Sequence, residues 1–405
     1  MANAFIAEPD LQFTKDLIRA GATDLKKCYQ CATCSVACRI SPDNNPYPRK
    51  EMIWAQWGIK DRLLNDPDVW LCHQCNDCST QCPRGAYPGD VLKAVRKLNI
   101  EQSCWPSFLG KLVGEPSLFV LAMGIPVVIV LLLTYFSNGF NFSGPTPVSY
   151  PGFIAYLPIQ IIYSLALLFA VVSIRVSLKN YWNKLEAHNP VDVQSPRKGF
   201  IPSFIEALQE ILPHTTFKDC EANNIRYAAH LMVFWGMIGL LVTTAIVAFN
   251  LDILHKLPPS RYGFLWVPIK ILGNVSAVAF VLGLLIMLVR RLTVPDEAGN
   301  SSYFDWFFLF IICGTGFTGL LLELLRFAGS TSGTYFVYMV HLMFILSLFL
   351  YLPFSKFAHL GYRTVAITWG KSVGRNMTIP VKPNYVPPAP TEPEPAGEEA
   401  TEGAA

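Results

Sequence analysis

Two short runs of cysteine carry the clearest chemistry in this sequence. Each run has four cysteines at the spacing C-x2-C-x2-C-x3-C, in CYQCATCSVAC from Cys28 and in CHQCNDCSTQC from Cys72. This spacing binds [4Fe–4S] clusters in bacterial-type ferredoxins, because three thiolates on one tight loop can reach three corners of a cubane. Zinc is the alternative, but zinc sites use two pairs of ligands and not four crowded cysteines. We therefore predict two [4Fe–4S] clusters.

The fourth ligand of each cluster is predicted to come from the other run. In two-cluster ferredoxins the last cysteine of one run ligates the cluster of the other run. Pro83 follows the last cysteine as it does in those ferredoxins, whereas Arg39 stands at that place after the first run. The predicted ligands of the first cluster are Cys28, Cys31, Cys34 and Cys82. The predicted ligands of the second cluster are Cys72, Cys75, Cys78 and Cys38.

Histidines near apolar segments form the second set of residues with evident chemistry. A polar ring in the hydrocarbon layer is costly and therefore marks a functional site. His230 and His359 fall at matching depths, so we predict that they face each other across the iron of an inner haem. His341 precedes His359 by eighteen residues, which on one continuous helix is about 27 Å and leaves room for an outer haem. Hydrogen bonding between neighbouring helices is the alternative role for His230 and His341.

The second ligand of the outer haem is harder to place. It is expected on the outer half of the span that carries His230, around residues 240–248, which contain no histidine. His255, slightly further out, is the nearest ring on that side. His214 lies on the other side unless its helix dips into the membrane. A five-coordinate outer haem, or no outer haem, is also open.

The elements that must hold these residues are mostly apolar helices. The chain has 405 residues, of which 52% are hydrophobic and 15% charged, and its net charge of +3 gives no case for a nucleic-acid partner. A helix needs about 20 apolar residues to cross a membrane, and six segments meet this length. They are Leu118–Phe136, Phe153–Leu178, Ala228–Asn250, Leu265–Val289, Tyr303–Leu325 and Tyr335–Phe354.

The positive charges predict which side each connection faces. The segments 179–226, 290–303 and the tail after residue 354 carry 6, 2 and 5 Lys or Arg. The connections on the other side are 137–152, 251–264 and 326–334, and they carry 0, 2 and 1 Lys or Arg. Cytoplasmic loops carry the excess of Lys and Arg. We therefore expect both termini in the cytoplasm and the chain in the cytoplasmic membrane, in agreement with an N-terminal stretch that lacks the apolar core of a signal peptide.

The predicted fold is mainly α, with three regions. Residues 1–115 form a small helical ferredoxin-like domain with two clusters, residues 116–362 a cytochrome b bundle of six transmembrane helices, and residues 363–405 a cytoplasmic tail. The end of this tail is rich in Pro, Glu and Ala, which is typical of disorder. Between the cysteine runs we expect a helix with Trp54 and Trp57 turned inward, and another helix after Pro88.

One connection is predicted to form a helix at the membrane surface. The segment PSFIEALQEILPH, which ends at His214, places Phe204, Leu208, Ile211 and Leu212 on one helical face. An apolar face of this kind can lie on the lipid headgroups, or it can pack against the soluble domain.

The two parts of the chain resemble known redox proteins. The cysteine runs resemble those of heterodisulfide reductase C subunits. The last four spans, from IRYAAHLMVFWG to FSKFAHLGYR, resemble the cytochrome b of heterodisulfide reductases and the gamma subunit of respiratory nitrate reductases. Their fusion resembles the C subunits of the quinone-interacting membrane-bound oxidoreductase family. The resemblance covers about residues 20–365, and the cysteine runs are its most specific part.

This resemblance implies cofactors and a substrate. It implies haem b and menaquinol, besides the two clusters. The nitrate reductase cytochromes have two histidines ten residues apart on one span and two histidines eighteen residues apart on another. His230, His341 and His359 match three of these four places. Leu240 stands at the fourth, where the family has a histidine. A lysine near the outer start of the next span helps to bind quinol in that family, and Lys270 occupies the matching place. Lys270 could equally snorkel to the membrane surface.

The resemblance also implies partner subunits and a path for the electrons. Menaquinol would give electrons through haem b and the clusters to cytoplasmic flavin- and iron–sulfur-binding subunits similar to heterodisulfide reductase A, and onward to adenylylsulfate reductase in sulfate respiration. A competing picture places the quinol beside the inner haem, near His214. One rival function is a fusion subunit of a heterodisulfide reductase-type complex that acts on a thiol disulfide. Another is a membrane anchor with a vestigial cytochrome, against which the eight clustered cysteines count.

Overall fold

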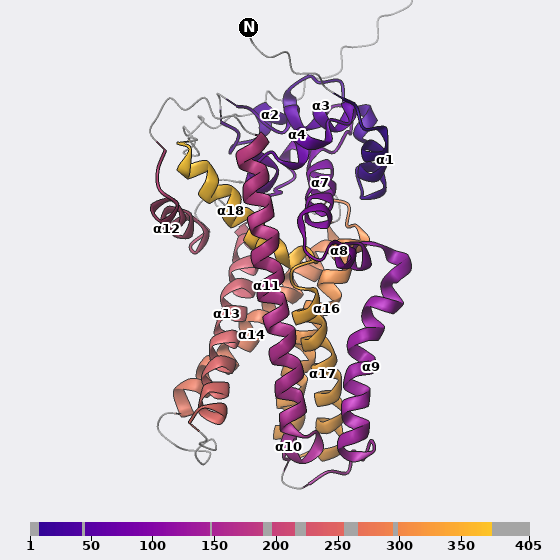
Figure 1. Cartoon of the computed structure of the whole chain (residues 1–405), viewed down its shortest axis with the longest axis vertical. Coiled ribbons are helices and arrows are strands. Elements are labelled where there is room, and N and C mark those ends of the chain that lie inside the picture. The colour runs from indigo at the N-terminus through magenta and orange to yellow at the C-terminus, as the bar shows by residue number, and fades with distance from the viewer. Residues whose placement is uncertain are drawn as a thin grey trace, which may run out of the picture.

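The computed structural model describes residues 8–42, 45–145, 148–188, 197–214, 224–254, 266–294 and 299–374. Every regular element in these residues is a helix, and they contain no strand. The short helices of the N-terminal part gather at one end of the long axis, and the long helices extend away from them (Figure 1). His255, Cys220 and the tail predicted to be disordered lie outside the described residues.

The N-terminal domain is built from short helices around one core. Phe13, Leu17, Met52, Leu63 and Val95 are among its buried side chains. The helices are α1 (Leu11–Arg19), α2 (Thr33–Ala37), α3 (Arg49–Trp57), α4 (Lys60–Leu64), α5 (Asp68–Leu71), α6 (Asp77–Thr80) and α7 (Pro88–Ser103).

The helix expected between the cysteine runs is divided into α3 and α4 at Gly58. Gly58 has a φ of +66°, and a Cβ there would lie 2.5 Å from the carbonyl oxygen of Asp10, so the break needs glycine. The prediction for Trp57 was wrong, because its side chain is 62% exposed. The buried face of α3 is set by Met52 and Ala55, and Trp57 lies about 140° around the helix from Met52.

Within the described residues, six helices are long and apolar enough to cross a membrane, which agrees with the predicted number. The largest difference from the expected bounds is in the second span, which continues to His188 and is 33 residues long. At about 1.5 Å per residue, it reaches well past the hydrocarbon layer to the N-terminal domain. The six helices are α9 (Phe119–Asn138), α11 (Tyr156–His188), α13 (Asn224–Asp252), α14 (Trp266–Thr293), α16 (Tyr303–Phe327) and α17 (Thr331–Tyr351).

The last span ends earlier than predicted. The sequence pattern placed His341 and His359 on one continuous helix, but α17 stops at Tyr351 and His359 is the first residue of α18 (His359–Ser372). Pro353 explains the break, because proline has no N–H and clashes with the carbonyl four residues before it. As a result α18 takes a new direction and crosses between the bundle and the N-terminal domain (Figure 1). It also runs across the predicted domain boundary at residue 362.

Aromatic packing joins the N-terminal domain to the bundle. Trp70 of α5 stacks on Tyr362 of α18 with ring centres 5.1 Å apart, and Tyr362 lies 5.3 Å from Tyr181 of α11. All three side chains are buried in one continuous core. Buried aromatic rings contribute the largest apolar areas of any side chains, so this contact fixes α18 against the domain.

The helix predicted at the membrane surface is α12 (Phe200–Ile211). It contacts α18, and its buried residues are Ser203 and Ala207. Ile201 and Ile205 are exposed on the same helix. One side of the helix therefore packs against protein, whereas Ile201 and Ile205 are left exposed.

Candidate functional site

The two cysteine runs fold into the same loop. Residues between the cysteines have left-handed backbone angles at matching places, with φ of 63° at Gln30 and 69° at Ala32 in the first run, and 56° at Gln74 and 76° at Asn76 in the second. Such residues turn successive N–H groups toward the inside of a loop, where they favour a negatively charged group. The third cysteine of each run then lies in a short helix, α2 or α6.

The backbone donates hydrogen bonds to the cysteine sulfurs. The N–H of Gln30 lies 3.4 Å from Sγ of Cys28, and the N–H of Gln74 lies 3.3 Å from Sγ of Cys72. Hydrogen bonds to the sulfurs are one of the means by which proteins tune the potential of iron–sulfur clusters. The repeated geometry therefore suits the ligation of a cluster in both runs.

The last cysteine of each run lies beside the opposite run. The charge of Cys82 acts on Cys28 and on Cys34. In the second group, Cys38 acts on Cys78. Cys38 also lines one small pocket with Cys72, Cys75 and Cys78, which fits the crossed pairing of a two-cluster ferredoxin.

The thiols need a positive centre before they can be ionised together. Burial raises the pKa of Cys34 to about 12, and it also raises the pKa of Cys38 and of Cys78. Neighbouring cysteines raise these pKa values further, because thiolates repel one another. A metal centre supplies the missing positive charge and deprotonates its thiol ligands. The residues present therefore fit iron–sulfur clusters.

Three histidines meet where the bundle joins the N-terminal domain. The ring centres of His230 on α13 and His359 on α18 are 6.4 Å apart, and the ring planes are 78° apart. Nε2 of His214, just beyond α12, lies 3.0 Å from Nδ1 of His230. The structure thus brings together the two predicted ligands of the inner haem and adds His214 as a neighbour.

The hydrogen bonds of these rings fix where their protons lie. The carbonyl oxygen of Lys356 lies 2.7 Å from Nδ1 of His359 and can only accept, so Nδ1 carries the proton and Nε2 does not. In the same way the carbonyl of Leu212 accepts from Nδ1 of His214. Nε2 of His214 must then accept from Nδ1 of His230. The unprotonated nitrogen of both His230 and His359 is therefore Nε2.

The charge state of the rings also suits metal binding. Burial lowers the pKa of His359 to about 4 and lowers the pKa of His214. Neutral imidazole is the form that ligates metal, and ligating histidines commonly donate their other N–H to a carbonyl or a second side chain.

A cavity of about 300 Å³ lies beside this histidine group. His214, His230 and His359 line it together with Cys72, His73 and Gln74 of the second cysteine loop. Apolar side chains of α13, α14 and α16 form much of its wall, among them Phe234, Leu284 and Leu309. Cations lie near the ends of the helices, and they include Arg226, Arg290, Arg291, Lys356 and Arg363.

This lining fits a haem. The porphyrin ring is flat and apolar and carries two carboxylates, so it matches an apolar wall with cations at one side. His230 and His359, whose ring centres are 6.4 Å apart, are the residues that would hold its iron.

His341 lies apart from this group, inside α17. Its Nδ1 is 2.9 Å from the hydroxyl oxygen of Thr318 on α16, and that hydroxyl donates to the carbonyl of Gly314. The hydroxyl oxygen therefore accepts from Nδ1 and leaves Nε2 unprotonated. Gly319 lets the ring approach α16, because a Cβ there would lie 3.1 Å from His341.

The predicted quinol residue lies near the start of α14. Lys270 is exposed there, and no hydrogen bond or ion pair links it to His341 within the described part of the chain. Leu240 packs among apolar residues of α14 and α16. His255, the predicted second ligand beside His341, lies outside the described residues.

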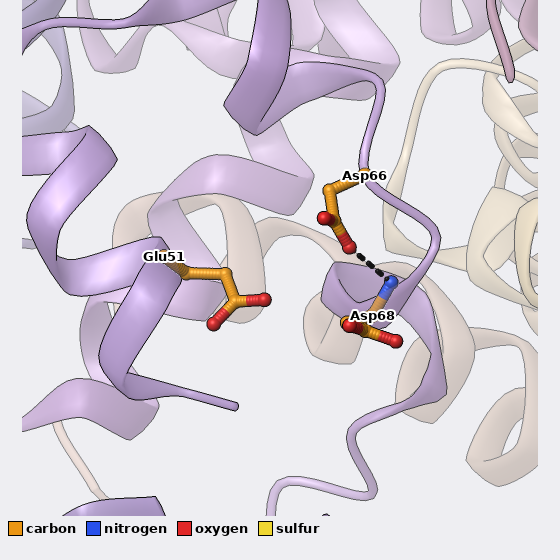
Figure 2. Close-up of side chains that lie close together, drawn as sticks. All are labelled: Glu51, Asp66 and Asp68. Atoms are coloured by element: carbon orange, nitrogen blue, oxygen red, sulfur yellow. Dashed lines mark hydrogen bonds between the residues drawn. The ribbon is translucent and has the colours of Figure 1, made fainter. Parts of the chain in front are cut away.

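A buried acidic group in the N-terminal domain is a different kind of site. Carboxylate oxygens of Glu51, Asp66 and Asp68 lie within 4.8 Å of one another (Figure 2). Nζ of Lys50 lies 2.9 Å from Asp66 and 3.6 Å from Glu51, and it also pairs with Asp68. The ammonium therefore takes the place that a metal cation would need, and the group acts as an ion network between α3 and the turn before α5.

Two family models match this chain. Residues 24–86, which contain all eight clustered cysteines, match the 4Fe-4S dicluster domain. With six helices of transmembrane length after them, these residues define a helical membrane protein with an N-terminal iron–sulfur domain. Residues 115–376 match the model described as citrate utilization protein B. This match covers more than half of the chain, which therefore belongs to the citrate utilization protein B family.

The cysteine domain is similar to C subunits of heterodisulfide reductases. It is 36% identical over 88 residues to the C subunit of the H(2):CoB-CoM heterodisulfide,ferredoxin reductase of Methanothermobacter marburgensis, which covers 22% of this chain and 47% of the relative. It is 30% identical over 105 residues to the iron-sulfur C subunit of the CoB--CoM heterodisulfide reductase of Methanopyrus kandleri, with 26% and 53% covered. The chain thus spans about half the length of these curated relatives. No solved structure matches.

Sequence reasoning missed the arginines that contact the second cysteine loop. Arg226 and Arg363 reach its carbonyl groups from α13 and α18. A signal was present, because each arginine is four residues from a predicted haem ligand, in RYAAH and HLGYR. The contact between His214 and His230 had no such signal, since it depends on how α12 packs.

The ion network around Lys50 gives a test of the N-terminal domain. Lys50→Met should lower the free energy of unfolding by about 3–5 kcal/mol, because it leaves buried carboxylates without their counter-ion. Thermal unfolding of the purified protein in detergent, followed by circular dichroism, would measure the change. Lys15→Met, at an exposed position on α1, is the matched control and should stay within about 0.5 kcal/mol. Equal stability of the two variants would contradict the assigned role of Lys50.

Proposed function

We propose that this chain is the membrane electron-transfer subunit of a larger oxidoreductase complex. It oxidises menaquinol in the cytoplasmic membrane, with both termini in the cytoplasm, and delivers the electrons through haem b and two [4Fe–4S] clusters. The receivers are cytoplasmic flavin- and iron–sulfur-binding subunits similar to heterodisulfide reductase A, and adenylylsulfate reductase beyond them. The match to the 4Fe-4S dicluster domain and the similarity to heterodisulfide reductase C subunits support electron transfer.

One observation carries this proposal. The same cavity is lined by His230 and His359 and by the loop that contains Cys72. Haem supplies one-electron chemistry when it is bound between two histidines, and the protein sets its surroundings. A haem site that opens onto an iron–sulfur loop suits a protein that conducts electrons between membrane and cytoplasm.

The ligands in this proposal follow the geometry. His230 and His359 hold the inner haem through Nε2, while His214 and the carbonyl of Lys356 accept hydrogen bonds from their Nδ1–H groups. His341 holds an outer haem, with His255 as its second ligand. The first cluster is held by Cys28, Cys31, Cys34 and Cys82, and the second by Cys72, Cys75, Cys78 and Cys38.

Lys270 is the proposed quinol-binding residue. It is exposed near the start of α14, and a quinone in the lipid can reach an exposed side chain there. An ammonium can donate a hydrogen bond to a quinone oxygen. The alternative residue, His214, is hydrogen bonded to the haem ligand His230, which makes it a support for that ligand.

A second function is favoured by the relatives. The proteins similar to the cysteine domain are named as parts of reductases for the CoB-CoM heterodisulfide. This chain could therefore supply electrons to a subunit that reduces a thiol disulfide. The companion subunits that copurify with the chain would distinguish the two functions.

Replacing one cluster ligand tests the iron–sulfur assignment. Cys78→Ala should lower the non-haem iron from about eight to about four per chain, because one of two [4Fe–4S] clusters is lost, and should leave the haem content unchanged. Iron analysis and the pyridine haemochrome spectrum measure both quantities. Cys104→Ala, at a buried cysteine outside the two runs, should keep all of the iron. Full iron in Cys78→Ala, or zinc in the anaerobically prepared protein, would overturn the assignment.

Two histidine variants test the inner haem. His230→Ala and His359→Ala should each lose the same low-spin haem b, because one iron needs both rings. Redox difference spectra and haem content are the readouts, and His188→Ala, at an exposed ring, is the control. His341→Ala should spare the inner haem and affect only the outer one. The pairing is wrong if His230→Ala and His359→Ala remove different haems.

Lys270→Ala tests the quinol site. Loss of a hydrogen bond from a charged group should slow haem reduction by a menaquinol analogue about tenfold or more, while reduction by dithionite and the haem spectra stay unchanged. Stopped-flow absorbance would measure the rate. Val267→Ala, at an exposed residue of the same turn, should react like the unmodified protein. A normal rate in Lys270→Ala together with a slow rate in His214→Ala would place the quinol beside the inner haem instead.

A further inference from the structure

Each histidine of the inner pair has an arginine one helical turn away. Arg226 precedes His230 by four residues on α13, and Arg363 follows His359 by four residues on α18. Residues four apart lie on the same face of a helix, about 6 Å along its axis. The two helices come from different parts of the chain, yet both carry the same pair of side chains into the cavity between bundle and N-terminal domain.

Both arginines contact the loop that carries Cys72. Arg226 donates to the carbonyl of His73 at 2.8 Å and to the carbonyl of Gln74. Arg363 donates to the carbonyls of Cys72 and Leu71, each at 3.3 Å, and also contacts the ring of His73 at 2.7 Å. The four carbonyls belong to consecutive residues, 71–74, so the two guanidinium groups hold one short stretch of backbone from two sides.

The shape of the loop explains why these carbonyls need arginine. The left-handed residues Gln74 and Asn76 turn peptide N–H groups toward the cysteine sulfurs, so the carbonyls point away from them. A buried carbonyl without a donor costs free energy. Arg96 of α7 helps from within the N-terminal domain and donates to the carbonyl of Cys72 at 2.6 Å. The remaining donors are provided by the helices that carry the haem ligands.

The first cysteine loop is held differently. The carbonyl of Cys28 accepts from the neutral side chain of Gln56, at 3.0 Å, which belongs to the same domain. Cys31 is exposed in this loop, and Tyr29 beside it is 68% exposed. One loop therefore faces the inner haem cavity across cationic side chains, whereas the other loop faces outward.

We propose that Arg226 and Arg363 form the electron-transfer junction of this protein, so that the second cluster is the first acceptor after the inner haem and the first cluster passes electrons to the partner. This inference rests on the proposed function. A haem held by His230 and His359 would supply one electron at a time, and a [4Fe–4S]²⁺ cluster held by Cys72, Cys75, Cys78 and Cys38 would accept it as [4Fe–4S]⁺. No bond or proton changes place. The guanidinium groups connect the two sites and stabilise the added negative charge on the cluster.

The order of the clusters can be tested by removing either one. Cys31→Ala should abolish the first cluster but still let a menaquinol analogue reduce the second, which would be seen as one electron paramagnetic resonance signal in rapidly frozen samples. Cys78→Ala should leave the inner haem reduced and the first cluster oxidised on the same time scale. Reduction of the first cluster in Cys78→Ala at the rate of the unmodified protein would overturn the proposed order.

The role of the arginines can be tested by redox titration. Arg363→Gln and Arg226→Gln should each change the equilibrium constant for one electron between the second cluster and the inner haem about tenfold in favour of the haem. The reason is that each variant removes a charge-assisted hydrogen bond beside the cluster. Arg363→Lys should recover part of the shift, since it keeps the charge. The matched control is Arg84→Gln, whose arginine donates to Tyr29 beside the first cluster and should leave the second cluster unchanged.

The outcomes separate this inference from the proposed function. Variants that keep full haem and iron but titrate like the unmodified protein would show that the arginines only hold the domains together, and the junction would be rejected. A shift in the first cluster instead of the second would reject it as well. Absence of haem or of cluster iron from the unmodified protein would reject the proposed function itself, and the titration could then not report on the arginines.

Discussion

The outward-facing carbonyl groups of the second cysteine loop are the constraint on which the rest of this structure depends. A loop that turns its N–H groups toward cysteine sulfurs must turn carbonyls the other way, and buried carbonyls require donors. Arg96, Arg226 and Arg363 supply them from three different helices. Satisfying one short loop therefore fixes the N-terminal ends of α13 and α18. The positions of His230 and His359 follow, because each is one turn from its arginine.

Apolar packing provides the stability that these polar contacts do not. A buried cation loses its hydration, and this cost can exceed what its hydrogen bonds contribute. The hydrogen bonds of the arginines are therefore weak evidence for net stabilisation. The ring stack of Trp70, Tyr181 and Tyr362 lies in a continuous buried core and joins α5, α11 and α18 without such a cost. We infer a division of labour in which aromatic burial holds the domain on the bundle. The arginines determine its orientation, since only one position satisfies all of the carbonyls.

Much of the fold could be predicted from the sequence, because it depends on local patterns. The cysteine spacing and the six apolar segments needed no knowledge of packing. Pro353 also indicated the break after Tyr351. The spacing of eighteen residues between His341 and His359, which is five full helical turns, nevertheless led to the wrong prediction of one helix. The prediction for Trp57 was wrong because the hydrophobicity of a residue does not show which face of α3 packs against the core. The crossing of α18 and the contact of His214 with His230 depend on tertiary packing, which no local pattern contains.

Backbone groups hydrogen bond to both sets of residues that we propose as metal ligands, the cysteines and the histidines. Around the cysteines, backbone N–H groups donate hydrogen bonds to the sulfur atoms. Around the histidines, Nδ1 of His359 donates a hydrogen bond to a backbone carbonyl, and Nδ1 of His230 donates to Nε2 of His214. The histidines are thereby held in the neutral form that binds metal, whereas the buried thiols need a metal centre before they lose their protons. Such preorganisation also lowers the cost of changing the charge of the cofactor, because the surrounding dipoles already point in the required direction. Fixed dipoles at the proposed metal sites would therefore reduce the reorganisation that accompanies each change of charge.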